Sequence, residues 1–135
     1  MCVEICYHNQ SIIDSIYCHD AYFETFSVDV AHRTITAVLR KQDPVKVSSI
    51  CFADIACCAV TGRETWGHDD CRILNWQCLF MEDAATEFQG LLCRLESGNW
   101  SDNRPDLTQL VCSEFVMSTG DRICIACRSV VVEET

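Results

Sequence analysis

Apolar and polar residues alternate along much of the chain, and this pattern predicts β-strands because successive side chains in a strand point to opposite faces. The predicted strands cover residues 2–8, 22–30, 33–40, 45–50, 55–60, 72–81, 110–117 and 123–132. The tight connection at Ala31-His32 predicts one hairpin, and the turn at 118–121 predicts another. The last of these strands is almost entirely apolar, which indicates burial on both faces. Residues 11–20 fit a helical stripe and a strand equally, and the pattern leaves them open.

The period changes after Met81. Apolar residues then recur at steps of three and four, as in the stripe of an amphipathic α-helix. The stripe consists of Met81, Ala84, Ala85, Phe88, Leu91, Leu92 and Leu95. Asp83 fits an N-cap and Gly98 fits a left-handed C-cap, so we expect a helix over about residues 82–97. We expect the rest of the chain to be organised around the strand 72–81 and this helix.

These elements predict an α+β fold, with an antiparallel β-sheet or a partly open β-barrel, one main amphipathic helix, and a β-hairpin after the helix. The chain has 135 residues, of which 49% are hydrophobic. That length and composition fit a single domain over residues 1–135.

The order of elements over residues 23–95 resembles the pleckstrin-homology-like superfold, which includes phosphotyrosine-binding domains. The matching features are the hairpin 23–40, the run 45–47 leading into 52–55, the following loop, the strand ending at 76–80 and the helix from Glu82. In that family the helix closes one end of a bent sheet and usually ends the domain, whereas about 37 residues follow it here. The resemblance implies a binding module in which an extended peptide pairs with a sheet edge beside the helix, here next to residues 55–60.

Twenty acidic residues face ten basic ones, which gives a formal net charge of −10. Such a chain repels phosphate groups, so we expect no nucleic acid or anionic lipid as a partner and favour a basic protein segment. Four basic residues, Arg33, Arg40, Lys41 and Lys46, lie close together in the sequence, and we interpret them as solvated charges. The sequence contains no run of about 18 apolar residues and no signal-peptide pattern, so we expect no membrane insertion.

The chain contains twelve cysteines, most of them within predicted strands or the predicted helix. Because a free cysteine behaves as a small buried hydrophobe, we expect most of them to be reduced core residues of a cytoplasmic or nuclear protein.

Two short motifs are candidate zinc ligands: the pair Cys124 and Cys127, and the pair His68 and Cys71. Residues three apart in a strand point to opposite faces, so Cys124 and Cys127 are better interpreted as core residues. The sequence places no histidine beside a particular cysteine, as a catalytic thiolate would require. We therefore assign no catalytic residue, metal or cofactor, and we expect binding rather than catalysis.

The function that we expect is that of an adaptor or scaffold module, which binds a protein or peptide segment at a sheet edge or a helix-flanked groove. The candidate partner-binding residues are Cys57, Ala59, Trp66, Phe88 and Trp100. The alternative is a self-associating structural or oligomerisation domain that uses the apolar C-terminal hairpin as its interface. A cysteine- or metal-dependent enzyme is the third interpretation.

Overall fold

The computed structural model describes residues 1–42, 45–60, 72–79, 90 and 109–135. These residues form seven strands and one 3-10 helix. In chain order the elements are β1 (Cys2–Ile5), η1 (Tyr7–Ser15), β2 (Tyr22–Asp29), β3 (Thr34–Gln42), β4 (Val45–Val60), β5 (Ile73–Cys78), β6 (Val111–Met117) and β7 (Arg122–Glu134).

All seven strands belong to one antiparallel sheet with the order β2-β3-β4-β7-β6-β5. Strand β7 is central: it pairs with β4 from Ser48↔Glu134 to Val60↔Ile123. Its other side pairs with β6 over the first half and with β1 over the second half. The ends of the strand order are therefore β2 and β5, and β1, which pairs only with β7 among the described strands, is a third edge strand.

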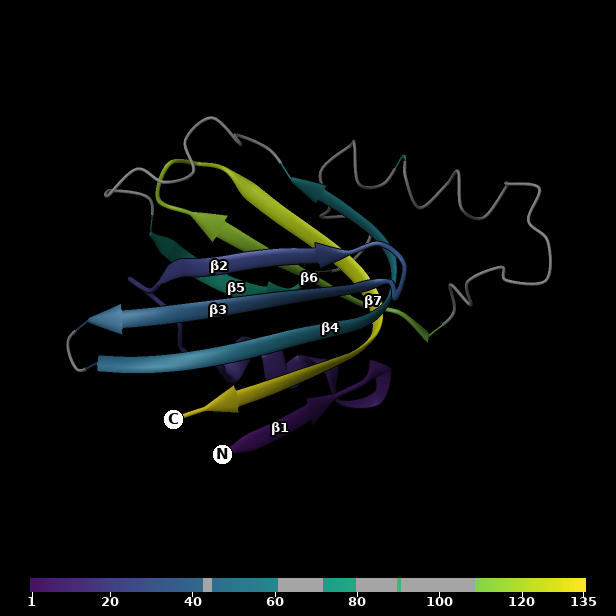
Figure 1. The fold of residues 1–135 in the computed structure, drawn as a ribbon, viewed down its shortest axis with the longest axis horizontal. Coiled ribbons are helices and arrows are strands. Elements are labelled where there is room, and N and C mark those ends of the chain that lie inside the picture. Colours follow the sequence, from purple (N-terminus) through teal and green to yellow (C-terminus); the bar gives the residue numbers. More distant parts are fainter. Residues whose placement is uncertain (43–44, 61–71, 80–89, 91–108) are drawn as a thin grey trace.

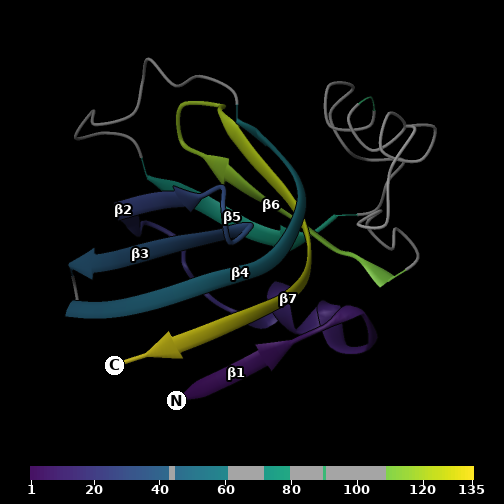
Figure 2. The same cartoon turned by 45° about the vertical axis from the view of Figure 1, so that its right-hand side comes forward.

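The sheet bends sharply, and the bend folds it into two facing layers (Figures 1 and 2). In β4 the pairing register with β7 shifts between Ile55 and Cys57, and Asp54 just before the shift has a φ of 55°. A bulge of this kind increases the local twist and bends the strand. Strands β2, β3 and the first part of β4 form the front layer in Figure 1, with β5 and β6 behind them.

The core fills the space between the layers. Trp76 of β5 stacks on Phe115 of β6, with ring centroids 5.1 Å apart and planes at 5°. Phe52 of β4 meets both rings edge-on from the other layer, at 6.1 and 6.3 Å. All three side chains are fully buried, so this aromatic group joins the two layers.

The predicted α+β class is wrong, because the described residues form a predominantly β fold with no long amphipathic helix among them. The predicted helix at about 82–97 falls, apart from Gly90, outside the described residues. The stretch 11–20, for which the pattern left helix and strand open, contributes residues 11–15 to η1, and Ile13 is buried there. Just before η1, the Cys6 N–H donates to Asn9 Oδ1 at 2.7 Å. No helix in the described part of the chain has the length and apolarity needed to cross a membrane.

The predicted strands agree with the structure better than the predicted fold class does. Both predicted hairpins are confirmed, β2 with β3 and β6 with β7. The predicted strands 45–50 and 55–60 are one strand, β4, because the bulge bends the chain without ending the pairing. The predicted burial of 123–132 on both faces is confirmed for Ile123–Cys127 only, because Arg128 is exposed and Ser129 and Val131 are half-buried. Because β7 is paired along both sides, the C-terminal hairpin completes the sheet and presents no open strand edge as an interface.

Candidate functional site

The β5 edge of the sheet is sealed by the chain segment that precedes β2. Ile73 exchanges two backbone hydrogen bonds with this segment, one to Ala21 O and one from Asp20 N, both 2.8 Å long. Further along β5, His19 Nδ1 lies 3.0 Å from Leu74 O. These contacts occupy the start of an edge that would otherwise be open to another strand.

Side chains continue the seal to the other end of β5. The backbone of Trp76 lies beside the Cys18 thiol and partly offsets the rise in its pKa that burial causes. The Cys78 N–H donates to Asp14 Oδ1 at 2.8 Å, and the Cys78 thiol donates to Gln10 Oε1 at 3.4 Å. Side chains from η1 and the following segment thus take the place of a partner strand.

The β2 edge differs, because no described strand or side chain seals its C-terminal half. Val28 is 59% exposed and Val30 is 80% exposed. Val28 lies opposite the buried Ile35, so it belongs to the inner face of the sheet. Apolar side chains at the rim of the core are thus open to solvent here, beside backbone groups that pair with β3 on one side only.

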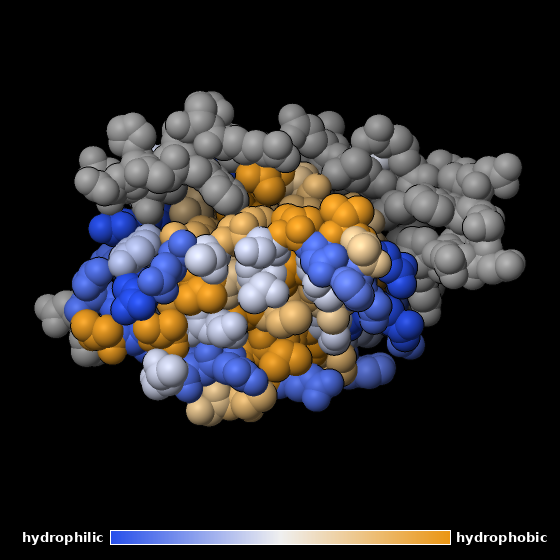
Figure 3. All heavy atoms as spheres, viewed as in Figure 1, coloured by the Kyte–Doolittle hydropathy of each residue, from blue (hydrophilic) through white to orange (hydrophobic). Residues whose placement is uncertain are grey.

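The outer face of the front layer offers no comparable apolar surface. Figure 3 shows hydrophobic residues on this side interspersed with hydrophilic ones. Large continuous apolar patches are typical of face-to-face docking. The end of β2 is therefore the better candidate on this side of the molecule.

The structure describes two of the five predicted partner-binding residues. Cys57 and Ala59 are half-buried on β4, opposite Ala126 and Cys124 of β7. They pack into a small apolar cluster with Leu79, Leu110, Cys112, Cys124 and Ala126. Trp66, Phe88 and Trp100 lie outside the described residues.

The ten described cysteines are all free thiols. For six of them, burial is the main cause that raises the pKa above the ordinary 9.0. It raises the pKa to about 12 for Cys57, Cys124 and Cys127, and to about 11 for Cys18 and Cys112. Thiols with such pKa values stay protonated near neutral pH and are poor nucleophiles.

Cys124 and Cys127 point to opposite faces of the sheet, as predicted. Cys124 belongs to the outer cluster and Cys127 to the core between the layers. The described residues include no group of three or more His, Cys, Asp or Glu side chains that could hold a metal ion. His68 and Cys71 lie outside them.

A buried carboxylate near Cys124 has no counterpart in the sequence predictions. Glu114 is 1% exposed, and its Oε1 lies 3.4 Å from Arg122 Nη1. Its Oε2 accepts a hydrogen bond from the Cys124 thiol at 3.5 Å. Because the buried charge has both an ion-pair partner and a donor, we interpret it as a structural group.

The four clustered basic residues all have partners. Arg33 pairs with Asp54 and Arg40 with Glu24. Lys46 Nζ lies 3.1 Å from Glu134 Oε2, and Lys41 Nζ lies 4.4 Å from the centroid of the Tyr17 ring. The ion pairs occupy three of these four charges, so these four residues do not form a cluster of unpartnered cations.

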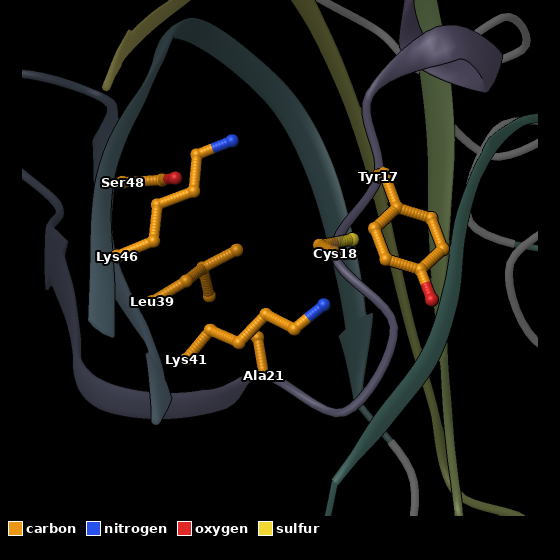
Figure 4. Close-up of a pocket in the computed structure, with 7 residues that line it drawn as sticks. All are labelled: Tyr17, Cys18, Ala21, Leu39, Lys41, Lys46 and Ser48. Atoms are coloured by element: carbon orange, nitrogen blue, oxygen red, sulfur yellow. The ribbon is translucent and has the colours of Figure 1, made fainter. Parts of the chain in front are cut away.

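Lys41 and Lys46 also line a small pocket with Tyr17, Cys18, Ala21, Leu39 and Ser48 (Figure 4). Its volume of about 20 Å³ holds roughly one water molecule. We interpret the two lysines as polar groups at the opening of this pocket, with the aliphatic parts of their side chains packed along its edge.

A larger groove of about 360 Å³ lies between η1 and the end of β5. It is lined by Tyr7, His8, Gln10, Ser11, Asp14 and Cys78. These η1 residues were absent from the sequence predictions; the one available signal was the spacing of Tyr7, Gln10 and Asp14, at steps of three and four on one helical face.

No known family model matches this chain, and no curated protein is significantly similar to it.

Proposed function

We propose that this protein is a non-enzymatic binding module that takes an extended segment of a partner protein at the C-terminal half of β2. The observation that carries the proposal is the difference between the two ends of the strand order. The β5 edge is sealed by its own chain, whereas Val28 near the end of β2 and Val30 just after the strand are exposed. An exposed strand edge is a ready template for a pairing strand.

In this proposal the backbone of β2 supplies affinity and the two valines supply side-chain contacts. Residues 27–29 pair with 34–36 of β3 on one side, and the incoming segment would pair on the other. Val28 lies on the inner face of β2 and Val30 follows in the turn after the strand, so apolar residues of the segment would pack on Val28 and next to Val30. The net charge of −10 favours a basic partner, because it steers cationic segments toward the protein.

The sheet-rich antiparallel architecture is compatible with a pleckstrin-homology-like assignment, which we keep as part of this proposal. In that family, peptides can add to a sheet edge. The free thiols among the described residues support a reducing compartment, cytoplasmic or nuclear.

A peptide-display selection against the immobilised protein tests the proposal. We expect selected peptides to lose at least tenfold in affinity against Val28→Lys and to keep it against Val45→Lys. Val45 is 67% exposed at the start of β4 and serves as the matched control. Peptides that bind both variants equally would place the site elsewhere.

Methylation of the peptide backbone separates strand pairing from plain hydrophobic contact. A strand that pairs along one edge uses every second N–H, so N-methylation at alternate positions should abolish binding while methylation between them should not. Equal effects at all positions would contradict pairing at the β2 edge.

Self-association is the second candidate, since the same β2 edge could pair with its copy. Sedimentation equilibrium distinguishes the two, because a mass that rises with concentration and falls back in Val28→Lys favours the copy over a different partner.

A further inference from the structure

The 360 Å³ groove beside η1 combines a fixed carboxylate with an aromatic ring. Asp14 Oδ1 accepts the Cys78 N–H at 2.8 Å, which ties the carboxylate to the end of β5. Tyr7 is 43% exposed and lines the same groove, and its ring meets His8 edge-on at a centroid distance of 5.8 Å. The described residues that line the groove include no lysine or arginine.

Each of the other two tyrosine rings has a cationic side chain of this chain over it. Lys41 Nζ lies 4.4 Å from the centroid of the Tyr17 ring, and the guanidinium carbon of Arg72 lies 4.9 Å from that of Tyr22. The chain has three tyrosines, and no described cation lies over the third, Tyr7. Within the described part of the chain its ring face lacks such a partner, so it can accept a cation from a ligand.

We propose that this groove binds an arginine side chain of a partner protein. The guanidinium would stack on the Tyr7 ring and donate to Asp14, with the Ser11 hydroxyl and the Gln10 amide beside it. Arginine fits better than lysine, because its planar group can stack and donate to a carboxylate at the same time. The groove is large enough for the whole side chain, unlike the pocket at Lys41 and Lys46.

This inference rests on the proposed function only in taking the ligand from a protein, and it concerns a different surface from the β2 edge. Asp14 plays two parts, as acceptor for the sheet and as counter-ion for the ligand. Asp14→Asn separates them, since the amide oxygen can still accept the Cys78 N–H while the charge is lost.

The test is titration of the full chain with acetyl-Gly-Arg-Gly-amide, followed by two-dimensional amide NMR. We expect saturable shifts confined to η1 and the end of β5. The same peptide with citrulline, a neutral isostere of arginine, should bind at least tenfold more weakly, because it lacks the positive charge that would pair with Asp14 and lie over the Tyr7 ring. The lysine peptide should bind about three- to tenfold more weakly than the arginine peptide.

The variants complete the test. Asp14→Asn should weaken binding about tenfold and Tyr7→Leu about three- to fivefold. Glu133→Gln, which removes one exposed carboxylate elsewhere, should bind as the wild type does. Equal binding of the citrulline peptide, or unchanged binding by Asp14→Asn, would overturn the inference. Val28→Lys should leave this titration unchanged, so failure at β2 and failure at the groove are distinguishable.

Discussion

The two ends of the strand order solve the same problem in different ways. Each is an edge strand whose outward backbone groups need partners. At β5, side chains and backbone of residues 14–21 supply them, including Asp14 and His19. At the C-terminal half of β2 the described residues supply none, and the inward-facing Val28 is left 59% exposed. The sealed β5 end of the strand order is therefore structural, and the exposed β2 end is suited to binding.

The largest contrast should come from the side chains that anchor each edge strand. Trp76→Ala in β5 should lower the free energy of unfolding by about 3–5 kcal/mol, because it removes the ring that stacks on Phe115. Val28→Ala in β2 should cost less than about 0.5 kcal/mol. Chemical denaturation measures both.

Trp76→Phe is the control for the first variant. The indole Nε1 of Trp76 is buried and has no hydrogen-bond partner. Losing it removes an unsatisfied donor, so phenylalanine should cost much less than alanine. Equal losses would mean that stacking is not what Trp76 contributes.

The contribution of the β5 seal to the free energy of unfolding should be measurable. Asp14→Ala leaves the Cys78 N–H without its acceptor and should cost about 1–2 kcal/mol, whereas Asp14→Asn keeps an acceptor and should cost less. Equal denaturation midpoints for all three proteins would show that water replaces the carboxylate at no cost.

Alkaline pH should destabilise the protein through its buried thiols, and Cys18 is the one in the segment that seals β5; β2 has no cysteine. Burial raises the pKa of the Cys18 thiol to about 11 in the folded protein, above its ordinary 9.0. A raised pKa means that the unfolded chain releases its proton first, so stability is full below pH 9 and is lost between pH 9 and 11. Cys18→Ala should lose about 1 kcal/mol less than the wild type between pH 8 and 10. Parallel pH profiles of the two proteins, followed by thermal unfolding, would contradict this account of Cys18.

The smallest effect belongs to the end of β2. Val30 is 80% exposed, so Val30→Lys should change stability by no more than about 0.5 kcal/mol. A loss several times larger would show that the valine is covered in solution, and the contrast between the two edges would fail.

The strands were predictable and the fold class was not. Alternation over 22–30 and 33–40 predicted β2 and β3 nearly to their ends. Strand β3 has one buried face, whereas β2 alternates in composition although none of its residues is fully buried. The sequence pattern did not reveal the bulge at Ile55, because an extra residue interrupts the apolar–polar alternation and resembles a gap between two strands. The α+β class depended on residues 82–97, which contribute only Gly90 to the described fold.

The candidate sites show where sequence reasoning stops. Cys57 and Ala59 were placed on the correct strand, but their burial depends on the pairing of β4 with β7, which no local pattern reveals. The β5 seal brings together residues about sixty positions apart, such as Asp14 and Cys78. Contacts of this range are set by topology, so the groove beside η1 could not be read from either segment alone.

The central place of β7 has a consequence for how the protein is made. Strand β7 pairs with β1, β4 and β6, and its partner residues in β1 lie about 130 positions earlier in the chain. Strands β2, β3 and β4 are linked by nearest-neighbour hairpins and can associate early during synthesis, but their bend has no support until β7 emerges from the ribosome. A sheet with such non-local pairing forms slowly, and until β7 is added the apolar β4 has no partner strand on one side. The nascent chain should therefore depend on chaperones until residues 122–134 have been added.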